Sequence, residues 1–81
     1  MSDSEHLDGI IRESIELENG QLANTAYGVT PTWDSVAHLM LMSAIEEGFG
    51  ITLDADDVVA MTDYPAIRRT LREQHGLDLG D

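Results

Sequence analysis

Apolar residues recur every three or four positions along much of the chain, which is the pattern of amphipathic helices. The first such stretch covers residues 4–18, with Asp3 or Ser4 as candidate N-cap. Asn19-Gly20 follows it and favours the left-handed backbone at which helices stop. The residues up to 32 show no sustained period and predict a long loop, which needs an apolar anchor of its own. The candidates for this anchor are Leu22, Tyr27 and Val29.

A second helix is expected from Asp34, whose carboxylate can accept hydrogen bonds from the first turn, to about Glu47. Gly48 and Gly50 are expected to end it. Its apolar residues form two stripes, which is more than one core face requires. The first stripe consists of His38, Leu41, Met42, Ile45 and Phe49, and the second of Val36, Leu39, Met40 and Ser43.

Capping residues indicate two further helices. Asp54 is expected to cap a short third helix that runs through Val58 and Val59. Thr62 or Asp63 is expected to cap a last helix, with a proline in its first turn.

The last helix is expected to end at Gly76, leaving residues 76–81 as a frayed tail. Its buried residues are predicted to be Tyr64, Ile67 and Leu71. The sequence therefore predicts a single domain over residues 1–81. Its fold class is all-α: a small four-helix bundle of three main helices and a short third helix, with a long first loop.

Composition narrows the possible functions. The chain has 16 acidic and 4 basic residues, a formal net charge of −12, and no cysteine. A nucleic-acid binder needs a positive footprint and an anionic membrane would repel the chain, so neither partner is expected. Without cysteine the chain has neither disulfides nor a thiol of its own. No apolar run is long enough to span a membrane, so we expect a cytoplasmic protein. By default we expect a monomer, in which the uncompensated negative charges repel one another.

The acidic run of Asp54, Asp56 and Asp57 raises the question of a calcium site. An EF-hand loop counted from Asp54 needs a glycine and a terminal glutamate in register. The run does not meet this requirement, because Val59 and Pro65 occupy those places. No metal site is therefore expected.

Two short motifs lie at the ends of the predicted second helix: Asp34-Ser35-Val36 opens it and Glu46-Glu47-Gly48-Phe49 closes it. From about residue 31 to 72 the chain resembles the acyl carrier protein family, whose members have Asp-Ser-Leu and Glu-Glu-x-Phe at these places. The resemblance implies that the chain is not an enzyme. It implies that a separate Mg²⁺-dependent phosphopantetheinyl transferase attaches a phosphopantetheine arm from coenzyme A to Ser35. The thiol of the arm then carries an acyl group as a thioester.

The resemblance also implies roles for the two stripes of the second helix. In the family, the outward face of this helix docks on acyl-loading and acyl-transferring enzymes, which points here to Val36, Met40 and Glu47. The alternative is that Val36 and Met40 belong to the core. In the family an attached chain can slip between the helices. The expected walls of such an acyl pocket are Leu41, Ile45, Met61, Ile67 and Leu71.

The chain departs from the family at several positions. Carriers of fatty-acid synthesis usually have acidic residues where this chain has Ala37 and Met40. Carriers of peptide synthetases usually have glycines where it has Trp33-Asp34. These differences favour an acyl carrier of a specialised biosynthetic pathway.

Other interpretations stay open. Ser35 can be an ordinary first-turn residue, and Trp33 can anchor the loop or contact the arm. Ser35, His38 and Asp34 resemble a nucleophile, base and orienter, but side chains at this spacing on one helix diverge and no oxyanion hole is visible. An acidic helical domain can also dock a partner through its apolar face without any modification.

Overall fold

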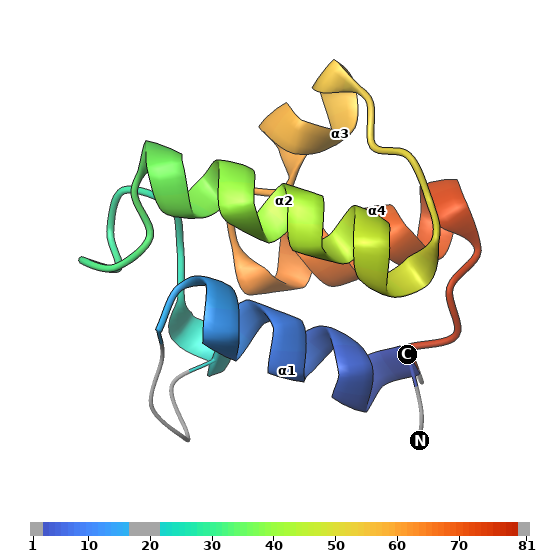
Figure 1. Ribbon diagram of the computed structural model, residues 1–81, viewed down its shortest axis with the longest axis horizontal. Coiled ribbons are helices and arrows are strands. Elements are labelled where there is room, and N and C mark those ends of the chain that lie inside the picture. Colours follow the sequence, from blue (N-terminus) through green and yellow to red (C-terminus); the bar gives the residue numbers. More distant parts are fainter. Residues whose placement is uncertain (1–2, 17–21, 80–81) are drawn as a thin grey trace.

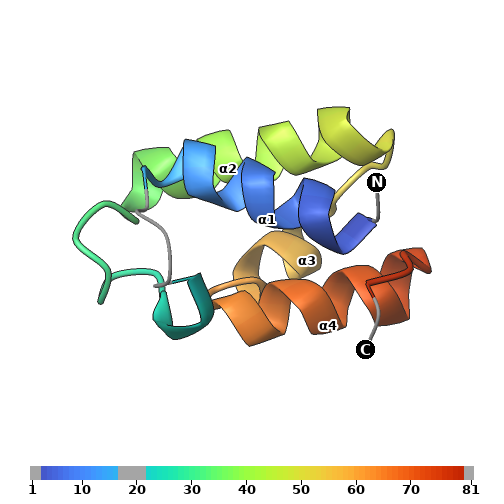
Figure 2. The same ribbon diagram turned by 90° about the horizontal axis from the view of Figure 1, so that it is seen from below.

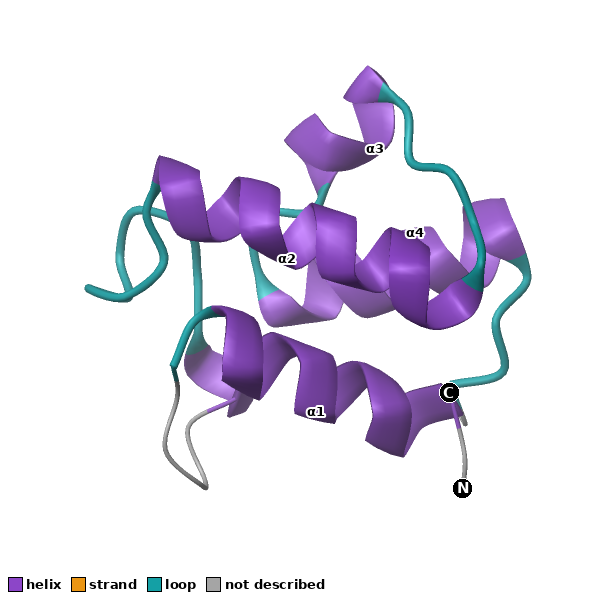
Figure 3. Cartoon of the chain, in the orientation of Figure 1, coloured by secondary structure: helices purple, strands orange, loops and turns teal. Residues whose placement is uncertain are grey.

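Four α-helices and one 3₁₀ turn form the fold in the computed structural model, which describes residues 3–16 and 22–79 (Figures 1 and 3). The helices are α1 (Asp3–Ser14), α2 (Ser35–Phe49), α3 (Ala55–Ala60) and α4 (Tyr64–His75), and the 3₁₀ turn η1 spans Leu22–Asn24. The protein is therefore all-α, with three main helices, a short third helix and a long first loop, as predicted. No helix in the described part is long and apolar enough to cross a bilayer.

The helices enclose one apolar core. α1 and α2 run antiparallel and lie side by side, while α4 forms a second layer across the core (Figures 1 and 2). The short α3 lies at one edge of the bundle (Figure 1). Apolar side chains fill the space between the layers, and their removal from water is the main stabilising contribution to folding. The largest fully buried side chains are Leu7, Ile11, Ile15, Trp33, Leu41, Ile45, Met61, Ile67 and Leu71.

Aspartates cap three of the helices. Asp34, Asp54 and Asp63 each accept a hydrogen bond from the backbone N–H three residues later, at 2.9, 2.8 and 2.8 Å respectively. Gly50 and Gly76 end α2 and α4 with φ of 65° and 67°, in the left-handed region that glycine adopts without strain. These caps confirm the predictions, and they select Asp63 over the alternative threonine at the start of α4.

The first helix differs from its prediction at both ends. Asp3 and Ser4 lie within α1 rather than capping it, and the helix ends at Ser14 rather than near residue 18. Glu16 has a φ of 51°, which lies in the left-handed region, so the right-handed helix cannot continue through this residue. The expected stop at Asn19-Gly20 falls outside the described residues.

Gly48 lies inside α2 and does not end it, which corrects the prediction. A Cβ atom at this position would lie 2.6 Å from Cδ1 of Ile10 on α1 and 3.4 Å from Nε2 of His6. The glycine therefore lets α1 pack closely against the end of α2.

Residues 77–79 pack against the bundle, so this part of the predicted frayed tail is wrong. Leu79 is 2% exposed and belongs to the core. The backbone N–H of Leu77 donates to the carbonyl of Leu71 at 3.2 Å, and Arg68 donates to the carbonyl of Leu79. The tail thereby lies beside the start of α1, where the N–H of Asp78 donates to Asp3 at 3.3 Å (Figure 1).

Candidate functional site

Ser35 is the first residue of α2 and is exposed. It follows directly after Asp34, whose Oδ1 accepts the N–H of Ala37 and thereby fixes the first turn. Unpaired N–H groups and the positive end of the helix dipole favour an anion at such a position. The predicted placement of Ser35 at the opening of the helix, with Asp34 as its cap, is confirmed.

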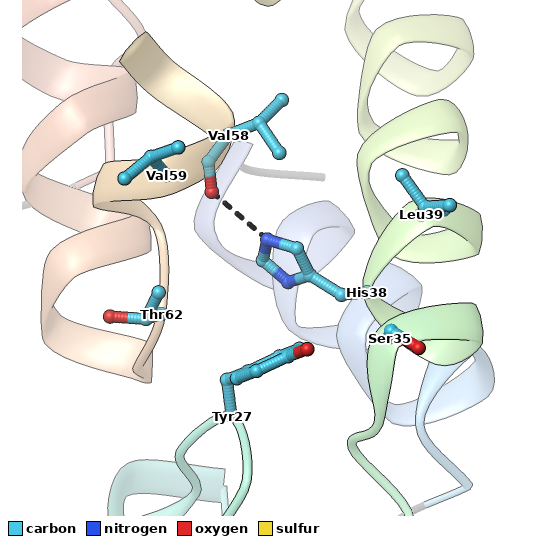
Figure 4. Close-up of a pocket in the computed structure, with 7 residues that line it drawn as sticks. All are labelled: Tyr27, Ser35, His38, Leu39, Val58, Val59 and Thr62. Atoms are coloured by element: carbon cyan, nitrogen blue, oxygen red, sulfur yellow. Dashed lines mark hydrogen bonds between the residues drawn. The ribbon is translucent and has the colours of Figure 1, made fainter. Parts of the chain in front are cut away.

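A pocket of about 350 Å³ opens beside Ser35, between α2, α3 and two loops (Figure 4). Its walls are mainly apolar, with a hydroxyl group from each loop. The lining residues are Tyr27, Ser35, His38, Leu39, Val58, Val59 and Thr62. The side chain of His38 lies between the two helices and the ring of Tyr27 lies below it (Figure 4).

The two loops reach the pocket because they are hydrogen-bonded to each other. The N–H of Tyr27 donates to the carbonyl of Thr62 at 2.8 Å, beside a single antiparallel bridge between Ala26 and Asp63. Such pairing joins segments more than thirty residues apart, and no local pattern signals it. Sequence reasoning therefore missed both loop residues of the pocket.

The first loop is anchored by Trp33 and Leu22. Trp33 is 0% exposed, which confirms its interpretation as an anchor packed on the bundle, and Leu22 is also buried. Val29 is exposed and Tyr27 partly so, so neither is the buried anchor that the sequence analysis considered.

His38 makes two hydrogen bonds that define its tautomer. The indole Nε1–H of Trp33 donates to His38 Nδ1 at 3.0 Å. Because an indole nitrogen only donates, Nδ1 must be unprotonated and the proton of the neutral ring lies on Nε2. Nε2 in turn donates to the carbonyl of Val58 at 2.9 Å. This carbonyl lies near the end of α3, where helix carbonyls lack a partner within the helix.

The arrangement does not favour Ser35 and His38 as a nucleophile and base. A general base needs a free nitrogen within hydrogen-bond reach of the proton it removes. Both nitrogens of His38 are occupied by Trp33 and Val58, and the carboxylate of Asp34 caps α2. His38 therefore acts in this site as a polar bridge between α2, α3 and the first loop.

Next to Ser35, α2 presents an exposed apolar face. Val36, Leu39 and Met40 are 64%, 63% and 59% exposed, so the alternative that Val36 and Met40 belong to the core is wrong. Glu47 is also exposed and borders a shallow depression together with Leu39 and Met40. Among the described residues, the large apolar side chains that are exposed all belong to α2, α3 or the first loop.

The five residues predicted to line an acyl pocket converge, but they do so in the closed core. Each is 0% exposed, and none lines the pocket beside Ser35; they are Leu41, Ile45, Met61, Ile67 and Leu71. That a cargo passes between them stays a prediction.

Two pairs of polar side chains outside the pocket connect helices to each other. Nε2 of His75 lies 2.8 Å from Oδ2 of Asp57 and joins α4 to α3. Arg68 lies 3.8 Å from Asp8 and joins α4 to α1. Within residues 3–16 and 22–79 no group of three or more metal-ligating side chains is arranged to hold a metal ion.

Comparison with known protein families, curated proteins and solved structures gives no match for this chain. What the site can do is therefore inferred from its own residues.

Proposed function

We propose that the protein is an acyl carrier, in which Ser35 bears a phosphopantetheine arm that holds acyl groups as thioesters and presents them to partner enzymes. The observation that carries this proposal is an exposed serine at the first position of α2, beside an apolar pocket and next to an exposed apolar face. The resemblance of residues 31–72 to acyl carrier proteins, carried by the motifs at the two ends of α2, also supports it.

The residues around Ser35 fit the transfer of an arm from coenzyme A. The hydroxyl oxygen of Ser35 forms a bond to the phosphorus that bears the pantetheine, the diphosphate bond breaks, and adenosine 3′,5′-bisphosphate leaves. The proton of the hydroxyl goes to a base of the transferase, since both nitrogens of His38 are already hydrogen-bonded. The product phosphodiester lies at a helix N-terminus, where negative charge is favoured. The arm supplies the thiol that a chain without cysteine lacks.

The exposed face of α2 is the proposed docking surface for partner enzymes. Val36, Leu39 and Met40 supply apolar contact area, and Glu47 lies at the edge of the same face. A chain with a net charge of −12 favours partners with basic surfaces, because complementary charge speeds association. The proposal includes a transferase and acyl-transferring enzymes as partners, action in the cytoplasm as a monomer, and a specialised biosynthetic pathway.

Intact mass spectrometry tests the covalent step. The unmodified protein is incubated with coenzyme A, Mg²⁺ and a broad-specificity phosphopantetheinyl transferase. We expect the mass of one phosphopantetheine on the wild type and none on Ser35→Ala. Ser43→Ala is the matched control, because Ser43 is exposed on the same helix, and it should be loaded like the wild type. An unmodified wild type, with the transferase proven active on another carrier, contradicts the proposal.

The exposed face also favours a second function, docking of a partner without any modification. Large exposed apolar side chains grouped on one region commonly mark interaction sites. This function requires Val36, Leu39 and Met40 but not the hydroxyl of Ser35. A wild type that resists the transferase, together with a partner that binds Ser35→Ala as tightly as the wild type, would favour this alternative.

A further inference from the structure

His38 forms the polar floor of the pocket beside Ser35. Its ring lies between α2 and α3, and Nε2 donates to the carbonyl of Val58 (Figure 4). Nδ1 accepts the indole N–H of Trp33. The ring of Tyr27 packs edge-on against it, with centroids 5.2 Å apart, and the indole of Trp33 lies with its centroid 6.0 Å away and its plane tilted by 29°. His38 is thus held by contacts from both loop aromatics and from both helices.

These contacts separate the pocket from the core. Leu41 and Ile45 continue the same buried face of α2 beyond His38, and both are 0% exposed. A chain that entered between α2 and α3 from the pocket would have to displace the imidazole. Displacement would leave the buried indole N–H of Trp33 and the partly buried carbonyl of Val58 without these partners, and unpaired buried polar groups are costly.

The pocket itself suits a small apolar group. Leu39, Val58 and Val59 form its walls, and its volume of about 350 Å³ lies at the lower end of the range for ligand pockets. The hydroxyl-bearing side chains of Tyr27 and Thr62 lie at its loop side.

We propose that His38 determines cargo length by closing the path between α2 and α3, so that the protein carries short acyl groups held in the pocket beside Ser35. A longer chain extends from the pocket into solvent instead of entering the core. This inference rests on the proposed carrier function of Ser35, and it names the substrate class of that site.

The absence of cysteine allows a test that does not depend on the transferase. In Ser35→Cys the new thiol is the single thiol of the chain, and an alkyl methanethiosulfonate attaches a butyl or dodecyl chain to it through a disulfide. Because residue 35 lines the pocket, a short chain reaches it directly. Ser43→Cys carries the same chains on the outer face of α2 and serves as the control.

Nuclear Overhauser contacts between the alkyl chain and methyl groups give the position of the chain. On Ser35→Cys we expect the butyl group to contact Leu39, Val58 and Val59. We expect the end of the dodecyl chain to contact neither Leu41 nor Ile45. The two conjugates should also melt within about 2 °C of each other. If the dodecyl chain were buried, its additional methylenes would raise the melting temperature by roughly 10 °C or more.

A matched pair of substitutions tests whether His38 is the residue that keeps the dodecyl chain out of the core. His38→Gln keeps a donor and an acceptor and should behave like the parent, whereas His38→Leu removes both and should admit the dodecyl chain to Leu41 and Ile45. Dodecyl contacts with these two residues while His38 is present would overturn the proposal, whether or not the leucine variant folds. A butyl group without contacts to Val58 or Val59, or a folded leucine variant that still excludes dodecyl, would overturn it too. Failure of the transferase on Ser35 is a separate result, because it refutes the carrier function and leaves these conjugates unaffected.

Discussion

At the scale of single residues, Tyr64 and Arg68 connect the last helix to the first. The hydroxyl of Tyr64 donates to Oδ1 of Asp8 at 2.7 Å and accepts from Arg68 at 3.0 Å. Arg68 also donates to Ser4 at 2.9 Å, and its guanidinium lies 5.5 Å from the centroid of the Tyr64 ring. Burial raises the pKa of Tyr64 above 10.0, the hydrogen bond and charge of Asp8 raise it further, and Arg68 opposes them.

The raised pKa of Tyr64 predicts a specific loss of stability at alkaline pH. The fold favours the neutral phenol, so this contribution is fully present below pH 10 and is lost as the pH rises through the folded pKa. The chain has no lysine and no cysteine, so tyrosine is the one kind of side chain in it whose ordinary pKa lies near 10. Tyr64→Phe should therefore lower the free energy of unfolding by about 1 kcal/mol at pH 8. This difference should shrink as the pH rises above 10.

Urea unfolding of both proteins across this pH range measures the difference. Tyr27→Phe is the matched control, because it removes the other phenol and keeps the Tyr64 network; it should follow the wild-type decline. A difference between wild type and Tyr64→Phe that stays constant with pH would contradict the assignment.

The role of a single residue could be predicted from the sequence where its hydrogen-bond partner lies only a few residues away along the chain. The aspartate caps bond three residues ahead, so Asp34 and Asp54 could be identified from the sequence, and Asp63 was one of two candidates. His38 instead bonds to Val58, twenty residues away, and Arg68 to Ser4, sixty-four residues away. A histidine within an apolar stripe was a signal that His38 is buried, but its partners depend on tertiary packing. The position of Ser35 at the start of the helix was expected, while the pocket beside it was not.

At the scale of elements, α2 combines a buried and an exposed apolar face. Its inward face carries Leu41, Met42 and Ile45, and its outward face carries Val36, Leu39 and Met40. Two stripes were visible in the sequence, but the periodicity alone left open which of them faces the core. The packing of α1 against α2, with close contact at Gly48, determines which stripe is buried.

Two methionines on this helix provide a matched comparison of the faces. Met40 is 59% exposed and Met42 is 4% exposed. Met40→Glu adds a charge in solvent and should change the free energy of unfolding by no more than about 0.5 kcal/mol. Met42→Glu adds the same charge in the core and should cost about 3 kcal/mol or more, which threatens a small domain. Circular dichroism during chemical denaturation measures both.

The same pair tests the docking surface. If partners bind the outward face, Met40→Glu should stay folded and yet slow loading of Ser35 by the transferase. Normal loading kinetics of a folded Met40→Glu protein would show that this residue is not part of that interface. A strong destabilisation by Met40→Glu would contradict the exposure of this face.

At the scale of the whole molecule, the exposed apolar side chains and the Arg68 network lie in different parts of the fold. Among the described residues, the large exposed apolar side chains lie on the first loop, α2 and α3. The network of Arg68 and the packed residue Leu79 instead hold α1, α4 and the tail together. The fold class followed from helical periodicity and caps, because helices are formed by local contacts. The packed tail did not follow, because residues 77–79 have no period and are held by distant partners.

Charge acts on the molecule as a whole and gives the last prediction. The net charge of −12 is contained in a body of 30 × 27 × 19 Å. At 0.01 M salt the screening length is about 30 Å, so charges repel across the entire molecule, whereas at 0.15 M it is about 8 Å and only neighbours interact. Salt should therefore raise the melting temperature by relieving repulsion in the folded state.

The ion pair of Arg68 with Asp8, which salt could weaken, opposes this effect only slightly. Its side chains are 13% and 24% exposed, and buried pairs are screened much less than exposed ones. We expect a rise of roughly 5 °C between 0.01 and 0.15 M NaCl, measured by the thermal loss of helical circular dichroism. MgCl₂ at equal ionic strength is the control and should give a similar rise, since the described part of the chain has no cluster arranged to hold a metal. A larger rise with Mg²⁺ would indicate specific binding of the cation. A melting temperature that salt leaves unchanged or lowers would mean that the local pairs outweigh the repulsion.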